Sequence, residues 1–242
     1  MKLLRNELKF FISTKDAYKL MDRLSIYLHV DEHSSAGPYN IKSVYLDTIN
    51  NSDLVEKLNG NLYREKYRFR YYDDDLSCVK FEIKRKLNTL IEKNSFKCNE
   101  NDLINVLNGN LNFSFLNKEN EYVKSRLKYL NYRPVVLVEY SRLAFYLPFN
   151  NIRVTFDSNL KACDINKSIN QNSSFVLNGF THTIHSSFSN YIVEVKYLDY
   201  LPDMILNELS NFNLIRSSIS KYVHSRKFNY FSPFEDGLYI PF

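Results

Sequence analysis

The chain has 242 residues, which is enough for one large domain or two small ones with a substantial hydrophobic core. With 44% hydrophobic residues, 5 glycines and 6 prolines, the composition excludes collagen-like, low-complexity and broadly disordered proteins. The net charge of +5 is too small to indicate nucleic-acid binding by itself, so the role of the cations depends on how they cluster.

Strand-like and helical patterns recur along the chain, and an aromatic content of 15% favours strands. The predicted strands are, in chain order, 5–12, 41–48, 64–72, 79–86, 135–145, 153–157, 174–177 and 191–197. Three amphipathic helices are predicted between or after them, at 14–24, 122–130 and 202–212. Thr14 offers an N-cap for the first helix, and Pro202 opens the third. Helices with one apolar face pack on the outside of a sheet, so we expect an α+β fold in which antiparallel strands dominate.

No linker, charge block or internal repeat divides the chain, and we predict a single domain, 1–242, with an aromatic C-terminal tail at 227–242. Cys78, Cys98 and Cys163 cannot all pair and are too far apart in sequence for a CxxC metal site, which is typical of a reducing compartment. No apolar stretch is long enough for a signal peptide or a membrane span. We therefore expect a soluble, cytoplasmic protein.

The strand at 64–72 carries cations at every second position, and successive side chains of a strand point to opposite faces. Its charged face contains Arg64, Lys66, Arg68 and Arg70, and its other face contains Tyr67, Phe69 and Tyr71. The next strand places Lys80, Glu82, Lys84 and Lys86 opposite Val79, Phe81 and Ile83. An open sheet with one solvated face would explain these two strands alone.

Shorter strands repeat this division, which favours an enclosed charged face. Their charged faces contain Glu7 and Lys9, Arg153 and Asp157, and Glu194 and Lys196, opposite large apolar residues such as Val193 and Val195. If all the charged faces converge in a closed sheet, the product is a barrel with a polar lumen and an apolar exterior covered by helices. Its cations would outnumber its carboxylates, so the lumen would require an anion, and a polyanion fits best.

Eight strings in one order, from Arg5 to about Val223, resemble the catalytic domain of the vacuolar transporter chaperone (VTC) complex and its free-standing bacterial relatives. They are RNELKFFIS (5–13), SVYLDT (43–48), YREKYRFRYY (63–72), FEIKRK (81–86), VEYSRLAF (138–145), IRVTFD (152–157), VEVKY (193–197) and SISKYV (218–223). That family belongs to the triphosphate tunnel metalloenzymes. The resemblance implies an eight-stranded antiparallel β-barrel whose lumen binds triphosphate.

For the VTC branch the resemblance also implies synthesis of inorganic polyphosphate from the γ-phosphate of ATP, with Mn²⁺ or Mg²⁺ as the metal. The implied catalytic residues are Arg142, Arg153, Lys221 and Lys84. The implied phosphate-binding and lumen residues are Lys9, Arg64, Lys66, Arg68, Arg70, Lys86, Tyr140 and Lys196. Glu194 is the implied metal ligand. These roles suit phosphoryl transfer, which needs charge neutralisation, positioning and a metal.

The first strand departs from the hydrolase and cyclase branch of the superfamily, which carries an ExExK string there. Here it reads Glu7-Leu8-Lys9, with one acid, which favours the VTC branch. Glu82 is either a second metal ligand or the ion-pair partner of Lys84, and we expect Asp47 and Asp157 to orient arginines. The sequence shows neither an SPX domain nor membrane helices, so regulation through the former is not implied and export would require a membrane-protein partner.

Three functions remain open at this point: a polyphosphate polymerase with ATP and polyphosphate as its partners, a tunnel triphosphatase, and a non-catalytic module that binds polyphosphate or nucleic acid. Tyrosines interleaved with arginines can bind single-stranded nucleic acid by stacking. Tyr67, Phe69 and Tyr71, however, lie on the face opposite the cations. We therefore expect no nucleic-acid partner and rank the polymerase first.

Overall fold

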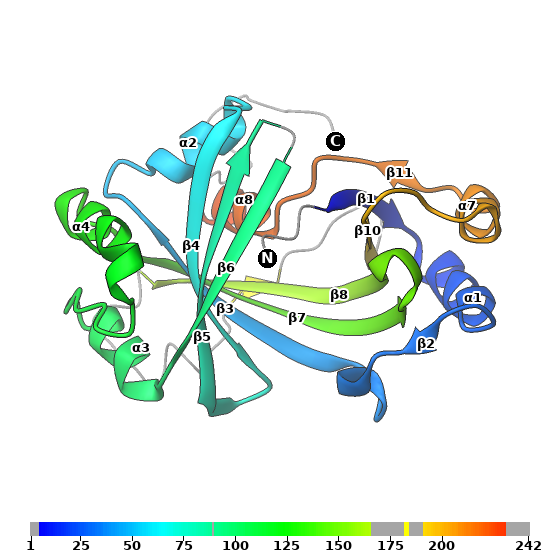
Figure 1. Cartoon of the computed structure of the whole chain (residues 1–242), viewed down its shortest axis with the longest axis horizontal. Coiled ribbons are helices and arrows are strands. Elements are labelled where there is room, and N and C mark those ends of the chain that lie inside the picture. Colours follow the sequence, from blue (N-terminus) through cyan, green and yellow to red (C-terminus); the bar gives the residue numbers. More distant parts are fainter. Residues whose placement is uncertain (1–4, 89, 166–181, 184–190, 231–242) are drawn as a thin grey trace.

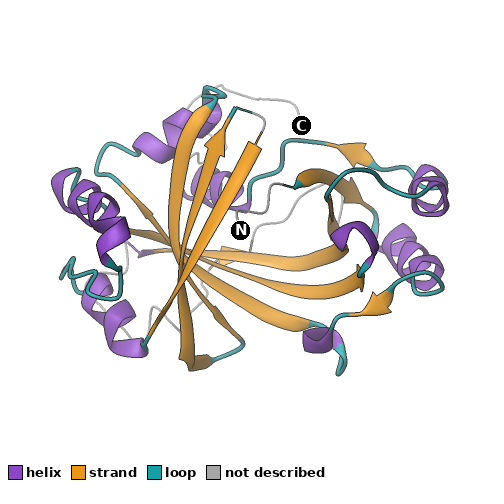
Figure 2. Ribbon diagram, in the orientation of Figure 1, coloured by secondary structure: helices purple, strands orange, loops and turns teal. Residues whose placement is uncertain are grey.

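The computed structural model describes residues 5–88, 90–165, 182–183 and 191–230. Within these residues, eleven strands form one antiparallel sheet with the order β11-β1-β10-β8-β7-β3-β4-β5-β6, while β2 pairs with β7 and β9 with β8 (Figures 1 and 2). The strands are β1 (Asn6–Ile12), β2 (His29–Val30), β3 (Tyr39–Asp47), β4 (Tyr63–Tyr72), β5 (Asp75–Leu87), β6 (Leu90–Cys98), β7 (Arg133–Leu147), β8 (Ile152–Asp164), β9 (His182–Thr183), β10 (Tyr191–Tyr197) and β11 (Ile215–Arg216).

The sheet is not closed into a barrel, so the closed eight-stranded barrel expected from the sequence is not confirmed. Within the described residues, backbone pairing ends at β6 on one side and at β11 on the other. Charged side chains from distant strands meet on the inner face of the sheet, where Lys84 Nζ of β5 lies 3.2 Å from Glu7 Oε2 of β1. β1 and β5 each already pair with two neighbouring strands, so this ion pair spans the charged inner face of the sheet and not a gap between its two edges.

The described residues form six main helices, four on the outer side of the sheet and two, the second and the last in chain order, against its pocket-lining face (Figure 2). They are α1 (Thr14–Leu24), α2 (Ser52–Leu58), α3 (Glu100–Leu107), α4 (Glu121–Tyr129), α7 (Asp203–Ser210) and α8 (Lys221–Tyr230). Short 3₁₀ turns occur at Glu32–Ser34 (η1), Lys118–Asn120 (η2) and Phe149–Asn151 (η3). None of the helices described is long and apolar enough to cross a membrane.

The apolar strand faces form two large cores under these helices, as the alternation predicts. In one core the aromatic face of β4 and β5 packs against α3 and α4, and Tyr67, Phe69, Phe81 and Ile83 are fully buried there. In the other core Val193 and Val195 of β10 pack with the apolar faces of α1 and α7. Burial of each large side chain contributes about 1.5–3 kcal/mol, so these two faces hold the charged side of the sheet in place.

The helices differ from the sequence prediction in detail. Ser13, not Thr14, caps α1, because its Oγ accepts a hydrogen bond from the amide of Asp16 at 3.1 Å. The third predicted helix ends at Ser210, before Phe212. The sequence prediction missed α2, α3 and α8, of which α3 begins with a capping box formed by Asn99 and Asp102. The predicted strand 174–177 and most of the aromatic tail lie outside the described residues.

The cysteines follow the sequence prediction, because Cys78, Cys98 and Cys163 are all free thiols. Cys98 and Cys163 are buried in the core that α3 and α4 cover. Burial raises the pKa of the Cys98 thiol to about 12, so this group stays protonated and behaves as a small apolar residue.

Candidate functional site

The inner face of the sheet lines a pocket of about 1130 Å³. Fifteen lysine or arginine residues but only four glutamates line it, so its charge is strongly positive. All thirteen predicted site residues line this pocket: Lys9, Arg64, Lys66, Arg68, Arg70, Lys84, Lys86, Tyr140, Arg142, Arg153, Glu194, Lys196 and Lys221. The structure thus brings the predicted residues together, whereas their individual roles stay predictions.

The pocket is also lined by four cations that the sequence analysis did not select: Arg5, Lys57, Lys93 and Arg216. Lys93 lies on β6 directly opposite Lys84 in the strand register, so an alternation pattern in 90–98 could have indicated it. Lys57 lies on α2, a seven-residue helix whose position next to the pocket has no local sequence signal. Lys57 and Lys93 add positive charge near β4, β5 and β6, and Arg5 and Arg216 add it near β1 and β11.

Glu194 of β10 is the centre of the charged cluster. Its carboxylate lies 2.9 Å from Lys221 Nζ, 3.1 Å from Lys196 Nζ and 3.4 Å from Lys9 Nζ. Arg142 Nη2 approaches to 3.8 Å. Burial would raise the pKa of Glu194, but the surrounding cations outweigh burial and hold the pKa well below its ordinary value. Glu194 is therefore an ionised carboxylate near neutral pH.

Glu7 of β1 is the second carboxylate of this cluster and shares cations with Glu194. Its oxygens lie 3.2 Å from Lys84 Nζ, 3.6 Å from Lys196 Nζ and 3.8 Å from Lys9 Nζ. Burial alone would raise the pKa of Glu7, but Lys84 and Lys9 lower it to about 2. Two ionised carboxylates therefore stand next to one another among lysines that neither of them can fully neutralise.

Asp157 of β8 orients Arg142, as predicted from the sequence. Its two oxygens accept hydrogen bonds from Arg142 Nε at 2.6 Å and Nη2 at 2.7 Å, a bidentate arrangement that fixes the plane of the guanidinium. Lys221 Nζ lies 2.6 Å from the same carboxylate and so bridges Asp157 and Glu194. The remaining donors of Arg142 are left for a ligand in the pocket.

Glu82 of β5 has other partners than the predicted one. Its carboxylate contacts Arg68 Nη2 at 2.6 Å and Lys93 Nζ at 2.5 Å, whereas Lys84 pairs with Glu7. The strand register explains the difference, since Arg68 stands directly opposite Glu82 while Lys84 lies on the next row. The prediction of a Glu82–Lys84 pair was wrong because neighbours across a ladder are closer than residues two apart on the same strand.

Asp47 does not orient an arginine, contrary to the sequence prediction. It lies fully buried at the end of β3 and accepts hydrogen bonds from the amide of the next residue, Thr48, and from the amides of Asp53 and Leu54 in the first turn of α2. Tyr222 of α8 also donates its hydroxyl to Asp47. Because Tyr222 adjoins Lys221, this contact fixes the start of α8, and with it the lysine that bridges Asp157 and Glu194.

Two lysines on the charged face of β4 and β5 lie in surroundings that disfavour their protonated, charged forms. Burial, together with the nearby Lys84 and Lys57, lowers the pKa of Lys66 to about 7. Burial also lowers the pKa of Lys84, to about 8, although Glu7 partly offsets this. Without an anion these lysines are therefore partly uncharged near neutral pH, and a bound polyanion would favour their charged forms.

We expect the affinity for inorganic tripolyphosphate to fall as the pH rises from 6 to 9, by roughly tenfold per unit above the pKa of Lys66. The reason is that binding must first protonate lysines that are neutral at the higher pH. Titration calorimetry across this range measures the effect. The matched variant Lys66→Arg keeps its charge and should flatten the dependence near pH 7–8, while the ionisation of the ligand itself is the same for both proteins. An identical pH profile in both would contradict the assignment.

The donors of the pocket fit a divalent metal only together with phosphate. The described residues hold no group of three or more histidine, cysteine or acidic side chains that could hold an ion alone. Mg²⁺-type ions, however, commonly use one or two carboxylates and complete their shell with water and substrate phosphates. Glu194 and the adjacent Glu7 provide such a pair, so the residues present fit a metal that enters with its substrate.

Two pocket arginines keep buried Nε atoms without a hydrogen bond. Within the described residues these are Nε of Arg70 and of Arg153. Arg70 Nε lies 3.6 Å from Glu82 Oε2, so its charge has a partner at ion-pair distance.

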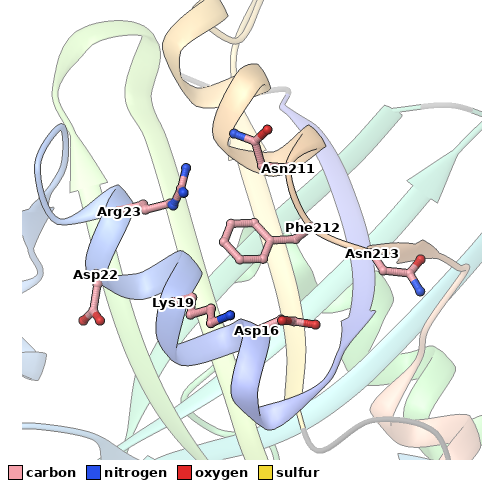
Figure 3. A pocket seen from close by; sticks show the side chains of 7 residues that line it. All are labelled: Asp16, Lys19, Asp22, Arg23, Asn211, Phe212 and Asn213. Atoms are coloured by element: carbon pink, nitrogen blue, oxygen red, sulfur yellow. The ribbon is translucent and has the colours of Figure 1, made fainter.

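A second pocket, of about 620 Å³, lies between α1 and the residues that follow α7 (Figure 3). Asp16, Lys19, Asp22 and Arg23 of α1 line it together with Asn211, Phe212 and Asn213. Its acids and bases are balanced, and Arg23 is already paired with Glu208 at 3.1 Å. This pocket has no excess charge and no contact with the Glu194 cluster, so we do not assign it a polyanion.

The VTC domain family model matches residues 4–230. The chain belongs to this family. No curated protein matches it. A candidate adenylate cyclase from Bacillus halodurans has a TM-score of 0.53 at 12% identity, over 96% of this chain and 99% of its own. A second candidate adenylate cyclase, from Vibrio parahaemolyticus, has a TM-score of 0.51 at 10% identity, over 93% of this chain and 98% of its own.

At these identities the structural likeness shows the fold alone, which is that of the triphosphate-tunnel proteins. As a VTC domain with this fold, the protein is a member of the triphosphate-tunnel group. The reaction that it carries out has to be argued from its own pocket.

Proposed function

We propose that this VTC domain is a polyphosphate polymerase, which transfers the γ-phosphate of ATP to a growing inorganic polyphosphate chain. The observation that carries the proposal is the excess of fifteen cations over four glutamates around one pocket. Four of these cations follow one another on β4, at intervals of about 6.8 Å along the strand. A linear polyanion longer than a single triphosphate would use the whole row.

The residues of the Glu194 cluster suit the transfer step. Lys221 and Arg142, fixed by Asp157, can hold the γ-phosphate and offset the charge that develops on it. Lys9 and Lys196 lie within 3.4 Å of Glu194 and can hold the neighbouring phosphates. An oxygen of the terminal phosphate of the acceptor then forms a bond to the γ-phosphorus, while the bond from that phosphorus to the bridging oxygen of ADP breaks.

A divalent ion, Mn²⁺ or Mg²⁺, would be held by Glu194 beside Glu7 and would supply charge neutralisation on the phosphates. The chain itself positions the donor and the acceptor, because its cations are fixed by ion pairs before any ligand binds. Positioning of this kind can account for a large part of the barrier to a reaction between two bound anions.

The same carboxylates argue for a phosphate acceptor instead of water. A hydrolase needs a base that removes a proton from water, and the best base has a pKa near the operating pH. The pKa of Glu7 is about 2 and the pKa of Glu194 lies well below its ordinary value, so both are weak bases. The terminal phosphate of polyphosphate is already ionised and requires no such base.

The proposal is tested by incubating the purified protein with ATP and Mn²⁺. We expect ADP together with a ladder of long polyphosphate on a gel, and an exopolyphosphatase should degrade the ladder. Orthophosphate formed in equal amount with ADP, and no ladder with any metal, would show a tunnel triphosphatase. Binding of polyphosphate with neither product would show a non-catalytic binding module.

A further inference from the structure

The two ends of the charged pocket differ in chemistry. At one end lie the turn between β4 and β5 and the start of β3, and at the other lies α2 (Figure 1). The α2 end is lined by the cations Lys57, Arg64 and Lys86. The opposite end is lined by Tyr39, the first residue of β3, and Tyr72, the last residue of β4. Three cations thus gather at the α2 end, whereas Tyr39 and Tyr72 add aromatic rings to the opposite end.

The aromatic end is built from three rings, His33, Tyr39 and Tyr72, which we call the aromatic cluster. The rings of His33 and Tyr72 are nearly parallel, at 16°, with their centres 6.1 Å apart. Tyr39 lies 6.0 Å from Tyr72 and 5.9 Å from His33. His33 is exposed on η1, and Tyr72 is partly exposed. Tyr39 is buried in the core that also contains Leu54 and Tyr222, and Tyr72 packs against that core, but both tyrosines line the pocket. The accessible aromatic surface of the cluster is therefore that of Tyr72 and His33.

Tyr72 differs in this respect from the other aromatic residues of its strand. Tyr67, Phe69 and Tyr71 are buried on the outer face, under the helices. Tyr72 lines the pocket, beyond Arg70, at the point where the pairing of β4 with β5 shifts register. Tyr72 is therefore an aromatic residue of β4 that lies on the cationic face of the strand.

The aromatic cluster adjoins the residues that would hold phosphates. Tyr39 stands opposite Arg142 in the pairing of β3 with β7. Its hydroxyl lies 3.5 Å from Arg153 Nη2. A ligand whose flat ring lies on the cluster can therefore extend charged groups directly toward Arg142 and the Glu194 cluster.

We propose that the aromatic cluster binds the base of a nucleoside triphosphate, while the phosphates extend into the cationic part of the pocket. This inference rests on the proposed function and deepens it by assigning the base of the nucleotide donor to one end of the pocket. Bases stack on aromatic side chains irrespective of sequence, because every base has a π-face. Inorganic tripolyphosphate has no base and gains nothing from the cluster. The α2 end, where Lys57, Arg64 and Lys86 line the pocket, suits an inorganic chain.

The test compares the dissociation constants of ATP and of inorganic tripolyphosphate, measured by calorimetry without metal. Tyr72→Ala should weaken ATP binding roughly tenfold or more and change tripolyphosphate binding less than about twofold. Tyr72→Phe keeps the ring and should bind ATP normally. Because His33 is exposed, His33→Ala is the second variant, with a smaller loss in the same direction. Tyr63→Ala, at the other end of β4, is the matched control and should change neither constant.

Two results would overturn the base-binding assignment. One is an equal loss of ATP and tripolyphosphate affinity in both Tyr72→Ala and His33→Ala, which would show that the cluster only supports the pocket. The other is unchanged ATP affinity in both variants. Failure of the proposed function looks different, since a wild-type protein that binds ATP but makes no polyphosphate would leave these affinity ratios intact. A wild-type protein that binds neither ligand would refute both proposals.

Discussion

Replacing Glu194 by glutamine will lower the metal-dependent turnover of ATP by a factor on the order of 100 or more. The amide has nearly the same shape but no charge, so it cannot hold a divalent ion against the phosphates. Metal-free binding of tripolyphosphate should be retained or become tighter, because Lys9, Lys196 and Lys221 each lose an anionic partner within 3.4 Å. Turnover is measured as ADP release with Mn²⁺, and binding by calorimetry with a chelator.

Glu82→Gln is the matched control for Glu194→Gln, since it removes a buried pocket carboxylate that is paired with Arg68 and Lys93. We expect this variant to lower turnover far less than Glu194→Gln. An equal loss in the two variants would indicate that both carboxylates hold metal. Full Mn²⁺-dependent activity in Glu194→Gln would refute the metal assignment. Because removing one partner of a buried ion pair costs about 3–5 kcal/mol, unfolding is followed in the presence of tripolyphosphate, which should restore stability.

Replacing Lys221 by alanine will lower turnover by a factor on the order of 100 to 1000 and will also destabilise the protein without ligand. Lys221 Nζ lies 2.6 Å from Asp157 and 2.9 Å from Glu194, so its removal leaves two buried carboxylates facing each other. These carboxylates also repel the γ-phosphate that Lys221 would hold. Steady-state kinetics should show a fall in kcat, and thermal melting without ligand should show a lower midpoint.

Two comparisons separate the role of Lys221 from a general loss of charge. Lys19→Ala removes a lysine from α1, in the second pocket, and should leave turnover unchanged. Tyr222→Phe removes the hydroxyl that α8 donates to Asp47 but keeps Lys221, so we expect an intermediate loss. If Lys221→Ala retained more than about a tenth of the wild-type kcat, Lys221 would not contact the transferred phosphate.

The sequence by itself determined which strand faces are charged and which are apolar. The side chains of a strand alternate between its two faces. Arg64, Lys66, Arg68 and Arg70 therefore share one face of their strand, and Glu194 and Lys196 share one face of theirs, whatever the position of the strand in the fold. The same alternation placed Tyr67, Phe69, Val193 and Val195 in the cores. The resemblance to the VTC family also indicated which residues form the site, and all of these residues line one pocket.

Only the tertiary structure decided which of these charges meet, because pairing depends on the register between strands that are far apart in the sequence. The pairing of β4, β5 and β6 places Glu82 next to Arg68 and Lys93, whereas Lys84 forms its ion pair with Glu7 of β1. The tertiary structure also decides that backbone pairing ends at β6 and at β11 within the described residues, so that the sheet is not closed. The partners of Asp47 depend on where helices pack and not on strand register, since its side chain accepts hydrogen bonds from the first turn of α2 and from Tyr222 of α8. The aromatic cluster likewise joins η1, β3 and β4, which no local pattern could bring together.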